Sequence, residues 1–193
     1  MMNEGPKLPD FGNNLTTPGS SVIHFYFSRS EQLRFANFLT EGLGLGHAVI
    51  LAATAEVLPG FLREIKGSPV RAIRPGLKQV VLTSELPASI ATLTSTVREE
   101  ARQHQQLRVL ADFSSLVPHE QVFEVEAELS SSFQGLRLIS ITQYDGNAVN
   151  APVTVAQFKT HSIAIVGDAF YYENRKSTPP EHYLRKRAAA GAS

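Results

Sequence analysis

Short apolar runs alternate along this chain with longer segments whose apolar residues recur every three to four positions. The runs predict strands at residues 22–27, 47–53, 78–83, 107–111 and 136–142. Continuous apolar runs are typical of parallel strands buried on both faces. The longer segments predict helices at residues 30–43, 55–65, 89–104, 119–133 and 152–160. Ser28 or Ser30 is expected to cap the first helix.

This alternation predicts an α/β fold with a doubly wound, mostly parallel sheet and right-handed crossovers. Two further apolar runs, at residues 163–166 and 169–172, flank Gly167-Asp168 and predict an antiparallel hairpin at one edge. We expect one domain over residues 21–184. Residues 1–20 are expected to form an irregular lead-in, and residues 185–193 a basic tail.

Composition narrows the class of protein without identifying a ligand. The chain has 193 residues, 42% of them hydrophobic, with 18 basic and 18 acidic residues. This balance favours neither nucleic acid nor an anionic membrane as a direct partner. The chain has no cysteine, which excludes disulfides and thiolate metal sites and fits a reducing compartment. With no signal-peptide pattern and no long apolar span, the expected location is the cytoplasm.

Ligands of doubly wound sheets usually bind beyond the carboxyl ends of the strands. The polar residues that the chain places in those turns are the candidate ligand-binding residues. They are Ser28, Arg29, Ser30, Glu56, Asp112, Ser114, Tyr144 and Asp145.

The turn after the first strand lacks the signature of a phosphate site. A phosphate loop reads G-x-x-x-x-G-K-[ST] and holds phosphates with backbone N–H groups and a lysine. Here the turn is Ser28-Arg29-Ser30. We therefore expect no hydrolysis of ATP or GTP. Arg29 either pairs with Asp112 or Asp145 inside the former phosphate position, or faces an open cavity and binds an anionic ligand.

The other candidates each have two interpretations. Asp112 can hold a metal or polar ligand, or cap a turn. Glu56 can be catalytic, or it can be an acid favoured by a helix dipole. Tyr144 and Asp145 can orient a small molecule or form a turn. No G-x-S-x-G sequence is present, so a serine hydrolase is poorly supported.

Several motifs resemble the RecA/KaiC-like ATPase core. FANFLTEGLGLGHAVILAAT is similar to the helix and second strand of KaiC-type proteins, and RVLAD, ending at Asp112, is similar to a Walker B strand. Glu56 matches the place of a catalytic glutamate in KaiC-type ATPases.

The missing phosphate loop and several further residues make the chain similar to the MEDS domain. This is a sensory domain named after methanogens, methylotrophs and the dichloromethane regulator. The resemblance covers residues 21–184. Besides the closing sequence YYENRKSTPPEHYL, it is carried by Tyr26, Gln143, Tyr144, Asp145, Thr160 and His161. Thr142 stands where cysteine is common in the family, and Asp112 where glutamate is common.

The resemblance implies a sensory domain without catalytic activity. Its pattern also includes residues that we interpret as mainly structural: His24, Tyr26, His161, Tyr172, Glu173 and Asn174. A metal or pH-sensing pair of His24 and His161 is the alternative, although the histidine spacing does not predict a metal site.

The leading hypothesis is a regulatory protein that binds a small molecule or a signalling partner at the carboxyl edge of the sheet. Family members usually adjoin signalling modules, so we expect a separate partner, a kinase or a transcription regulator. One alternative is a nucleotide-binding protein with an atypical phosphate site at residues 28–30. The other alternative is a protein-interaction module without a ligand, for which a homo-oligomer is one expected form. The sequence identifies no cofactor.

Overall fold

A seven-stranded sheet forms the centre of the protein. The structure is a computed structural model, and it describes residues 18–67, 76–114, 116–118, 121–167 and 170–174. Six strands run parallel in the order β3-β2-β4-β5-β1-β6. Their bounds are β1 Ser21–Tyr26, β2 Ala48–Thr54, β3 Leu77–Leu82, β4 Leu107–Ser114, β5 Leu138–Asp145 and β6 Ile163–Val166. A seventh strand, β7 (Phe170–Glu173), pairs antiparallel with β6.

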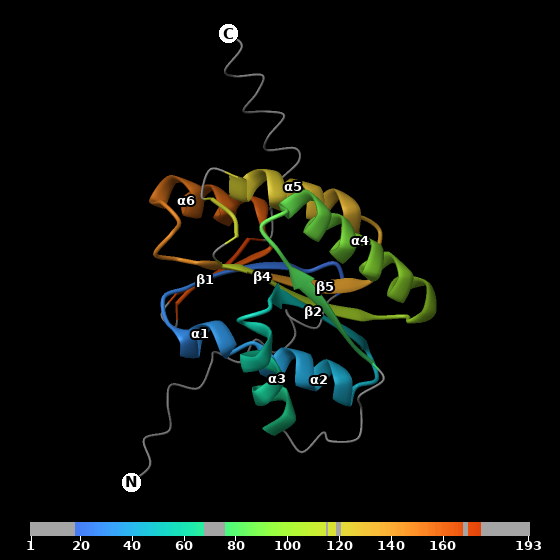
Figure 1. Ribbon diagram of the computed structural model, residues 1–193. Helices are drawn as coiled ribbons and strands as arrows, with labels where there is room; N and C mark the ends of the chain where they lie inside the picture. Colours follow the sequence, from blue (N-terminus) through green and yellow to red (C-terminus); the bar gives the residue numbers. More distant parts are fainter. Residues whose placement is uncertain (1–17, 68–75, 115, 119–120, 168–169, 175–193) are drawn as a thin grey trace.

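Helices cover both faces of the sheet (Figure 1). One layer contains α1 (Arg29–Leu33), α2 (Ala36–Gly44) and α3 (Leu58–Gly67). The other contains α4 (Leu86–Gln103), α5 (Val122–Phe133) and α6 (Ala151–Thr160). This α/β arrangement confirms the predicted fold class and is consistent with a RecA-like doubly wound fold. No helix in the described part of the chain is both long and apolar enough to cross a membrane.

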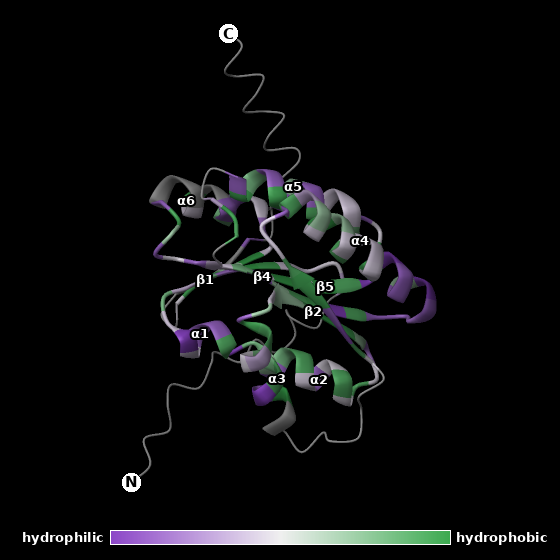
Figure 2. Ribbon diagram, viewed as in Figure 1, coloured by the Kyte–Doolittle hydropathy of each residue, from purple (hydrophilic) through white to green (hydrophobic). Residues whose placement is uncertain are grey.

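The core is divided by the sheet into two apolar clusters. Ile23 and Phe25 of β1 pack on the α4 and α5 side, whereas Val22 packs on the α2 and α3 side. The strands are accordingly apolar on both faces, and Figure 2 shows hydrophobic strands between helices that mix hydrophobic and hydrophilic residues. Successive residues of a strand point to opposite faces of the sheet, so successive side chains belong to different clusters.

The expected first helix is interrupted. It is divided into α1 and α2 at Arg34 and Phe35. The break turns the Phe35 ring toward the sheet, where it is 2% exposed and meets the His24 ring edge-on at 4.9 Å. Burial of this ring stabilises the interrupted path, which helical periodicity alone did not predict.

Other element boundaries also differ from expectation. β4 continues to Ser114 and β5 to Asp145, so residues expected in turns belong to strands. Pro59 lies in the first turn of α3, the helical position that tolerates proline, and α3 therefore begins at Leu58 rather than at residue 55. Gly167, expected in the last turn, has φ 55°. Asp168 lies outside the described residues, as do residues 1–17 of the expected lead-in and the expected tail.

Arg108 on β4 ties α2 to the sheet. Its Nη1 atom donates to the Phe38 carbonyl oxygen at 2.8 Å and to Glu41 Oε2 at 2.7 Å. Its guanidinium carbon also lies 4.8 Å from the centre of the Phe38 ring. A Cβ atom on Gly42 would come within 2.6 Å of Arg108 Cδ. The arginine stem therefore needs a glycine on the facing helix.

Phe38 is predicted to be a large contributor to stability. It is 6% exposed in the α2 side of the core. Phe38→Ala should lower the free energy of unfolding by about 3–5 kcal/mol, measured by chemical denaturation, because it leaves a cavity and removes the ring beneath Arg108. Asn37→Ala, at an exposed position of the same helix, should change it by less than about 0.5 kcal/mol. A Phe38 effect below about 1 kcal/mol would contradict the packing described.

Candidate functional site

A buried polar cluster lies near the carboxyl ends of β1 and β4. We call Tyr26, Gln32, Asp112 and Ser114 the Asp112 cluster; all are less than 10% exposed. Gln32 Nε2 lies 2.7 Å from Asp112 Oδ2, 3.0 Å from the Tyr26 hydroxyl and 3.1 Å from Ser114 Oγ. The Ser114 backbone N–H donates to Asp112 Oδ1 at 3.1 Å, and the Tyr26 hydroxyl donates to Ser114 Oγ. Both carboxyl oxygens therefore have partners within the protein.

The start of α1 positions Gln32. Ser28 is the N-cap residue, and its Oγ accepts the Glu31 backbone N–H at 3.3 Å. Glu31 Oε2 in turn accepts the Phe27 backbone N–H at 2.7 Å. This reciprocal pattern resembles a capping box, except that Glu31 accepts the N–H of the residue before the N-cap, and it satisfies two N–H groups at the helix start. The turn that would hold phosphates in a nucleotide-binding protein thus directs a glutamine toward Asp112.

Burial changes the acid–base properties of the cluster. Loss of solvation raises the pKa of Asp112 to about 7, although hydrogen bonds from Gln32 and Ser114 act in the opposite direction. Loss of solvation also raises the pKa of Tyr26, and the neighbouring Asp112 adds to this effect. Asp112 is consequently a carboxyl group that exchanges its proton near neutral pH, in contrast to an ordinary exposed aspartate.

A second pair of polar side chains supports the cluster from the sheet. Gln143 Nε2 donates to the Gln32 backbone oxygen at 3.0 Å and faces His24 Nδ1 at 2.9 Å. Both side chains are fully buried. Loss of solvation, with a smaller contribution from Arg34, lowers the pKa of His24 to about 3. His24 therefore stays neutral at physiological pH and accepts the Gln143 hydrogen bond through Nδ1.

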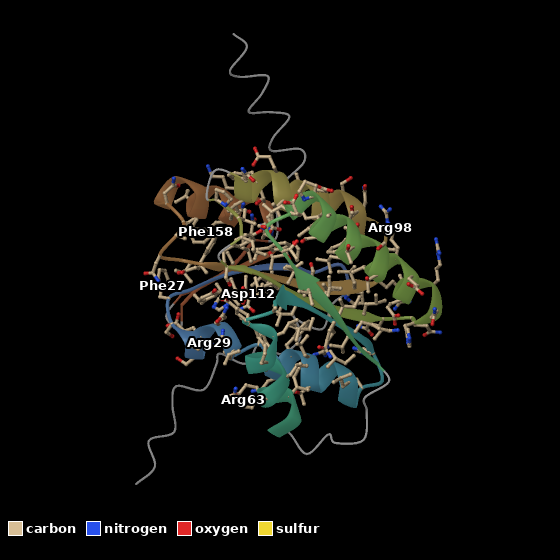
Figure 3. The ribbon with its side chains drawn as sticks, viewed as in Figure 1. Phe27, Arg29, Arg63, Arg98, Asp112 and Phe158 are labelled. Carbon is tan, nitrogen blue, oxygen red and sulfur yellow. The ribbon has the colours of Figure 1, made fainter. Side chains whose placement is uncertain are left out.

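Arg29 lies at the margin of the site (Figure 3). Its side chain starts from the exposed first turn of α1, whereas Asp112 is in the interior. The Arg29 Nη1 atom donates to Gln32 Oε1. Among the described ion pairs there is none between Arg29 and Asp112 or Asp145. Instead of the direct pairing, which was one of two alternatives for Arg29, the structure has a chain in which Arg29 donates to Gln32 and Gln32 donates to Asp112.

Tyr144 and Asp145 do not form one site. Adjacent strand residues point to opposite faces, and the Tyr144 hydroxyl donates to Glu126 Oε1 on the α5 side at 2.6 Å. Asp145 Oδ1 accepts the Asn147 backbone N–H at 2.9 Å, as in a turn. Asp145 therefore follows the structural interpretation, and Tyr144 belongs to a different polar group.

His24 and His161 are likewise separated by the sheet. His24 lies beside Phe35 on the α2 side, whereas His161 Nε2 lies 3.0 Å from Glu126 Oε2 on the α5 side. The alternative of a histidine pair is therefore wrong. In the described residues, no group of three or more histidine, cysteine, aspartate or glutamate side chains could hold a metal ion.

The remaining candidates lie outside the Asp112 cluster. Ser30 is exposed and its Oγ is 3.0 Å from Ser28 Oγ, and Glu56 is exposed in the turn before α3. Asn174 makes structural contacts, because its Nδ2 donates to the Phe158 oxygen at 2.9 Å and its backbone N–H to the Ser162 oxygen at 2.7 Å. Tyr172 and Glu173 lie in β7, as backbone of that strand.

Two residues of the polar groups were missed by sequence reasoning, Gln32 and Glu126, and Gln143 was named only for the MEDS resemblance and not as a candidate. Glu126 offered a signal, because it shares the helical stripe of Val122 and Leu129 and so faces the core. Gln32 gave none, since its role depends on which strands become neighbours.

Comparison with known proteins adds no relative. No protein-family model matches the chain, and no curated protein matches it.

Asp112 should make stability depend on pH between about 4 and 7. Its pKa is near 3.8 when unfolded and about 7 when folded, so the folded state binds more protons in this range. Stability should therefore fall as pH rises through the range, by up to about 4 kcal/mol, and Asp112→Asn should remove this dependence. Denaturation curves of both proteins from pH 4 to 8 measure it. Profiles that stay parallel would contradict the burial of an acid here.

Proposed function

We propose that this protein is a non-catalytic sensory or regulatory protein that acts by binding a partner. One observation carries the proposal: the carboxyl group of Asp112 is already engaged by Gln32 and by the Ser114 backbone N–H. In a RecA-like ATPase, an acid at the end of this strand would serve a magnesium nucleotide. Here the Asp112 carboxyl oxygens and the Ser28 hydroxyl accept hydrogen bonds from groups of the protein itself. The resemblance to MEDS sensory domains supports the same conclusion.

The recognition surface that we propose is the carboxyl edge around Phe27. Phe27 is 49% exposed although it directly follows the buried β1. Its ring lies over Gly146, where an added Cβ would come within 2.5 Å, and near Gly167, where an added Cβ would lie 3.5 Å from the ring. Exposed Arg29 and Ser30 are next along the chain, and Figure 3 places Phe27 and Arg29 at the same side of the molecule. An aromatic ring beside an arginine is the composition that protein-binding hot spots favour.

The partner that we propose is a separate signalling protein, either a kinase or a transcription regulator, in the cytoplasm. A protein partner fits this edge better than a nucleotide does, because the hydroxyl of Ser28 caps α1 and Gln32 occupies the space beside Asp112. The alternative nucleotide site at residues 28–30 would depend on Arg29 and Ser30 alone. Such a site lacks the glycine-rich backbone that supplies most phosphate contacts.

The first test measures nucleotide turnover and binding. The purified protein should hydrolyse neither ATP nor GTP above background, and millimolar magnesium nucleotide should leave its melting temperature unchanged, since no phosphate cradle is present. Gln32→Ala serves as a control, because it frees Asp112 without adding a phosphate loop and should remain inactive. Magnesium-dependent turnover that Asp112→Ala abolishes would overturn the proposal.

The second test locates the partner. A photoreactive phenylalanine analogue at position 27 should cross-link a kinase or transcription regulator in cells, identified by mass spectrometry. The same analogue at Val155, which is 52% exposed on α6, is the matched control and should not form that adduct. With the partner purified, Phe27→Ser should weaken binding by at least about tenfold, as expected for an anchor residue. Equal adducts from both positions, or unchanged binding by Phe27→Ser, would argue against this surface.

A further inference from the structure

A polar pocket lies at the opposite edge of the sheet from the Asp112 cluster. It has a volume of about 280 Å³ and lies between α5 and the amino-terminal parts of β1 and β5. The side chains that matter for its chemistry are Glu126, Leu129, Ser130, Phe133, Ser140 and Thr142. The serine and threonine of β5 are two residues apart and therefore point to the same face of the sheet.

The hydroxyl groups of this pocket are unusually free. Ser140 is 8% exposed, and in the described part of the chain its Oγ has no hydrogen-bond partner. Ser130, on the facing helix, likewise has no side-chain partner within the described residues. Thr142 Oγ1 has only a long contact, 3.4 Å, to the Val22 oxygen. Ser140 is therefore a buried hydroxyl without a protein partner, beside the half-buried Ser130 and the weakly bonded Thr142. Buried hydroxyls normally find partners, so Ser140 in this cavity points to a ligand that supplies one.

The charges in the pocket are already matched. Glu126 lines it, but Oε1 accepts the Tyr144 hydroxyl at 2.6 Å and Oε2 lies 3.0 Å from His161 Nε2. These residues are less than 6% exposed. No lysine or arginine is among the residues that line the pocket. A charged ligand would therefore lose its hydration without gaining an opposite charge, which is unfavourable.

The opposite wall is apolar. Leu129 and Phe133 belong to the same turns of α5 as Ser130, and both line the cavity. The pocket thus presents the Ser140 and Thr142 hydroxyls on the sheet side, and mainly hydrocarbon with the single Ser130 hydroxyl on the helix side. Its volume is just below the range of about 300–1,000 Å³ for drug-sized sites, which suits a smaller molecule.

We propose that this pocket binds a small uncharged molecule that carries two or more hydroxyl groups on one side and hydrocarbon on the other, a cyclic diol or polyol. Its hydroxyls both donate to and accept from Ser130, Ser140 and Thr142, while its carbon face packs on Leu129 and Phe133. This inference goes beyond the proposed function, because the pocket and the Phe27 surface lie at opposite edges of the sheet. Either can fail without the other.

The probes are three molecules of similar size. Cyclohexanediol is neutral, 2-hydroxycyclohexanecarboxylate is anionic and 2-aminocyclohexanol is cationic at neutral pH. Amide NMR spectra of the full chain, titrated with each probe at low millimolar concentration, report binding at Ser140 and Thr142. Low concentrations matter because polyols in bulk stabilise proteins without binding. The neutral probe should give saturable shifts at these residues, with an affinity at least about tenfold above that of either charged probe.

Variants test the site itself. Thr142→Val and Ser130→Ala should each weaken binding of cyclohexanediol about 3- to 10-fold, since each removes one hydrogen bond. Ser131→Ala, the next and exposed residue of α5, should leave the affinity unchanged. Ser140→Leu should fill the pocket and abolish binding. If that variant does not fold, the two smaller variants decide. The absence of saturable shifts, equal binding of the charged probes, or equal losses for Ser130→Ala and Ser131→Ala would overturn the proposal.

Discussion

Asp112 is placed where water does not reach it, and the side chains around it at the carboxyl edge of the sheet are arranged to offset the loss of hydration. An uncompensated charge at such a depth would be strongly destabilising. Gln32 and the Ser114 backbone supply hydrogen bonds, Gln143 fixes the backbone of Gln32, and Arg29 holds the other end of its amide. Because these contacts join α1 to β1, β4 and β5, the short helix cannot shift without leaving a buried polar group unpaired.

The same contacts satisfy the polar groups at this edge of the sheet without a bound nucleotide. In the proposed regulatory protein, the glutamine takes up the polar partners that phosphates and metal would otherwise satisfy. The interior of the site then serves stability, and recognition moves outward to the exposed Phe27 and Arg29. The neutral state of His24 fits this division, because a fully buried imidazole that stays uncharged acts as a hydrogen-bond acceptor and packing surface.

The sequence predicted the parts of the fold that depend on local pattern. Apolar runs identified the strands, and the spacing of Leu93 and Val97 identified α4, because burial imposes those periods. The break at Phe35 escaped prediction, since it depends on a ring that packs on a distant strand. The extension of β4 and β5 was missed for a similar reason, because polar residues can remain in a strand when a neighbouring element pairs them.

The candidate site was predictable only in part. The sequence correctly placed Asp112 and Ser114 at the carboxyl end of a buried strand, and topology brought them together with Tyr26. It did not indicate that the Tyr144 side chain points away from Asp145 and toward Glu126. Adjacent strand residues must point to opposite faces, but that rule applied only once both residues were known to lie in β5. Contacts such as that of Gln32 with Asp112 span 80 positions of sequence and depend on the strand order.

The close approach of Arg108 to Gly42 also couples the substitutions that are tolerated at two positions far apart in the sequence. The stem of the arginine occupies the volume that a side chain on the facing helix would need, and its guanidinium is held by the Phe38 carbonyl and Glu41. A descendant that acquired a larger residue at 42 would have to lose the arginine, and one that lost the arginine would be left with a void beside a glycine. Positions 42 and 108 should therefore change together among diverging sequences, with intermediates that carry only one of the two changes selected against.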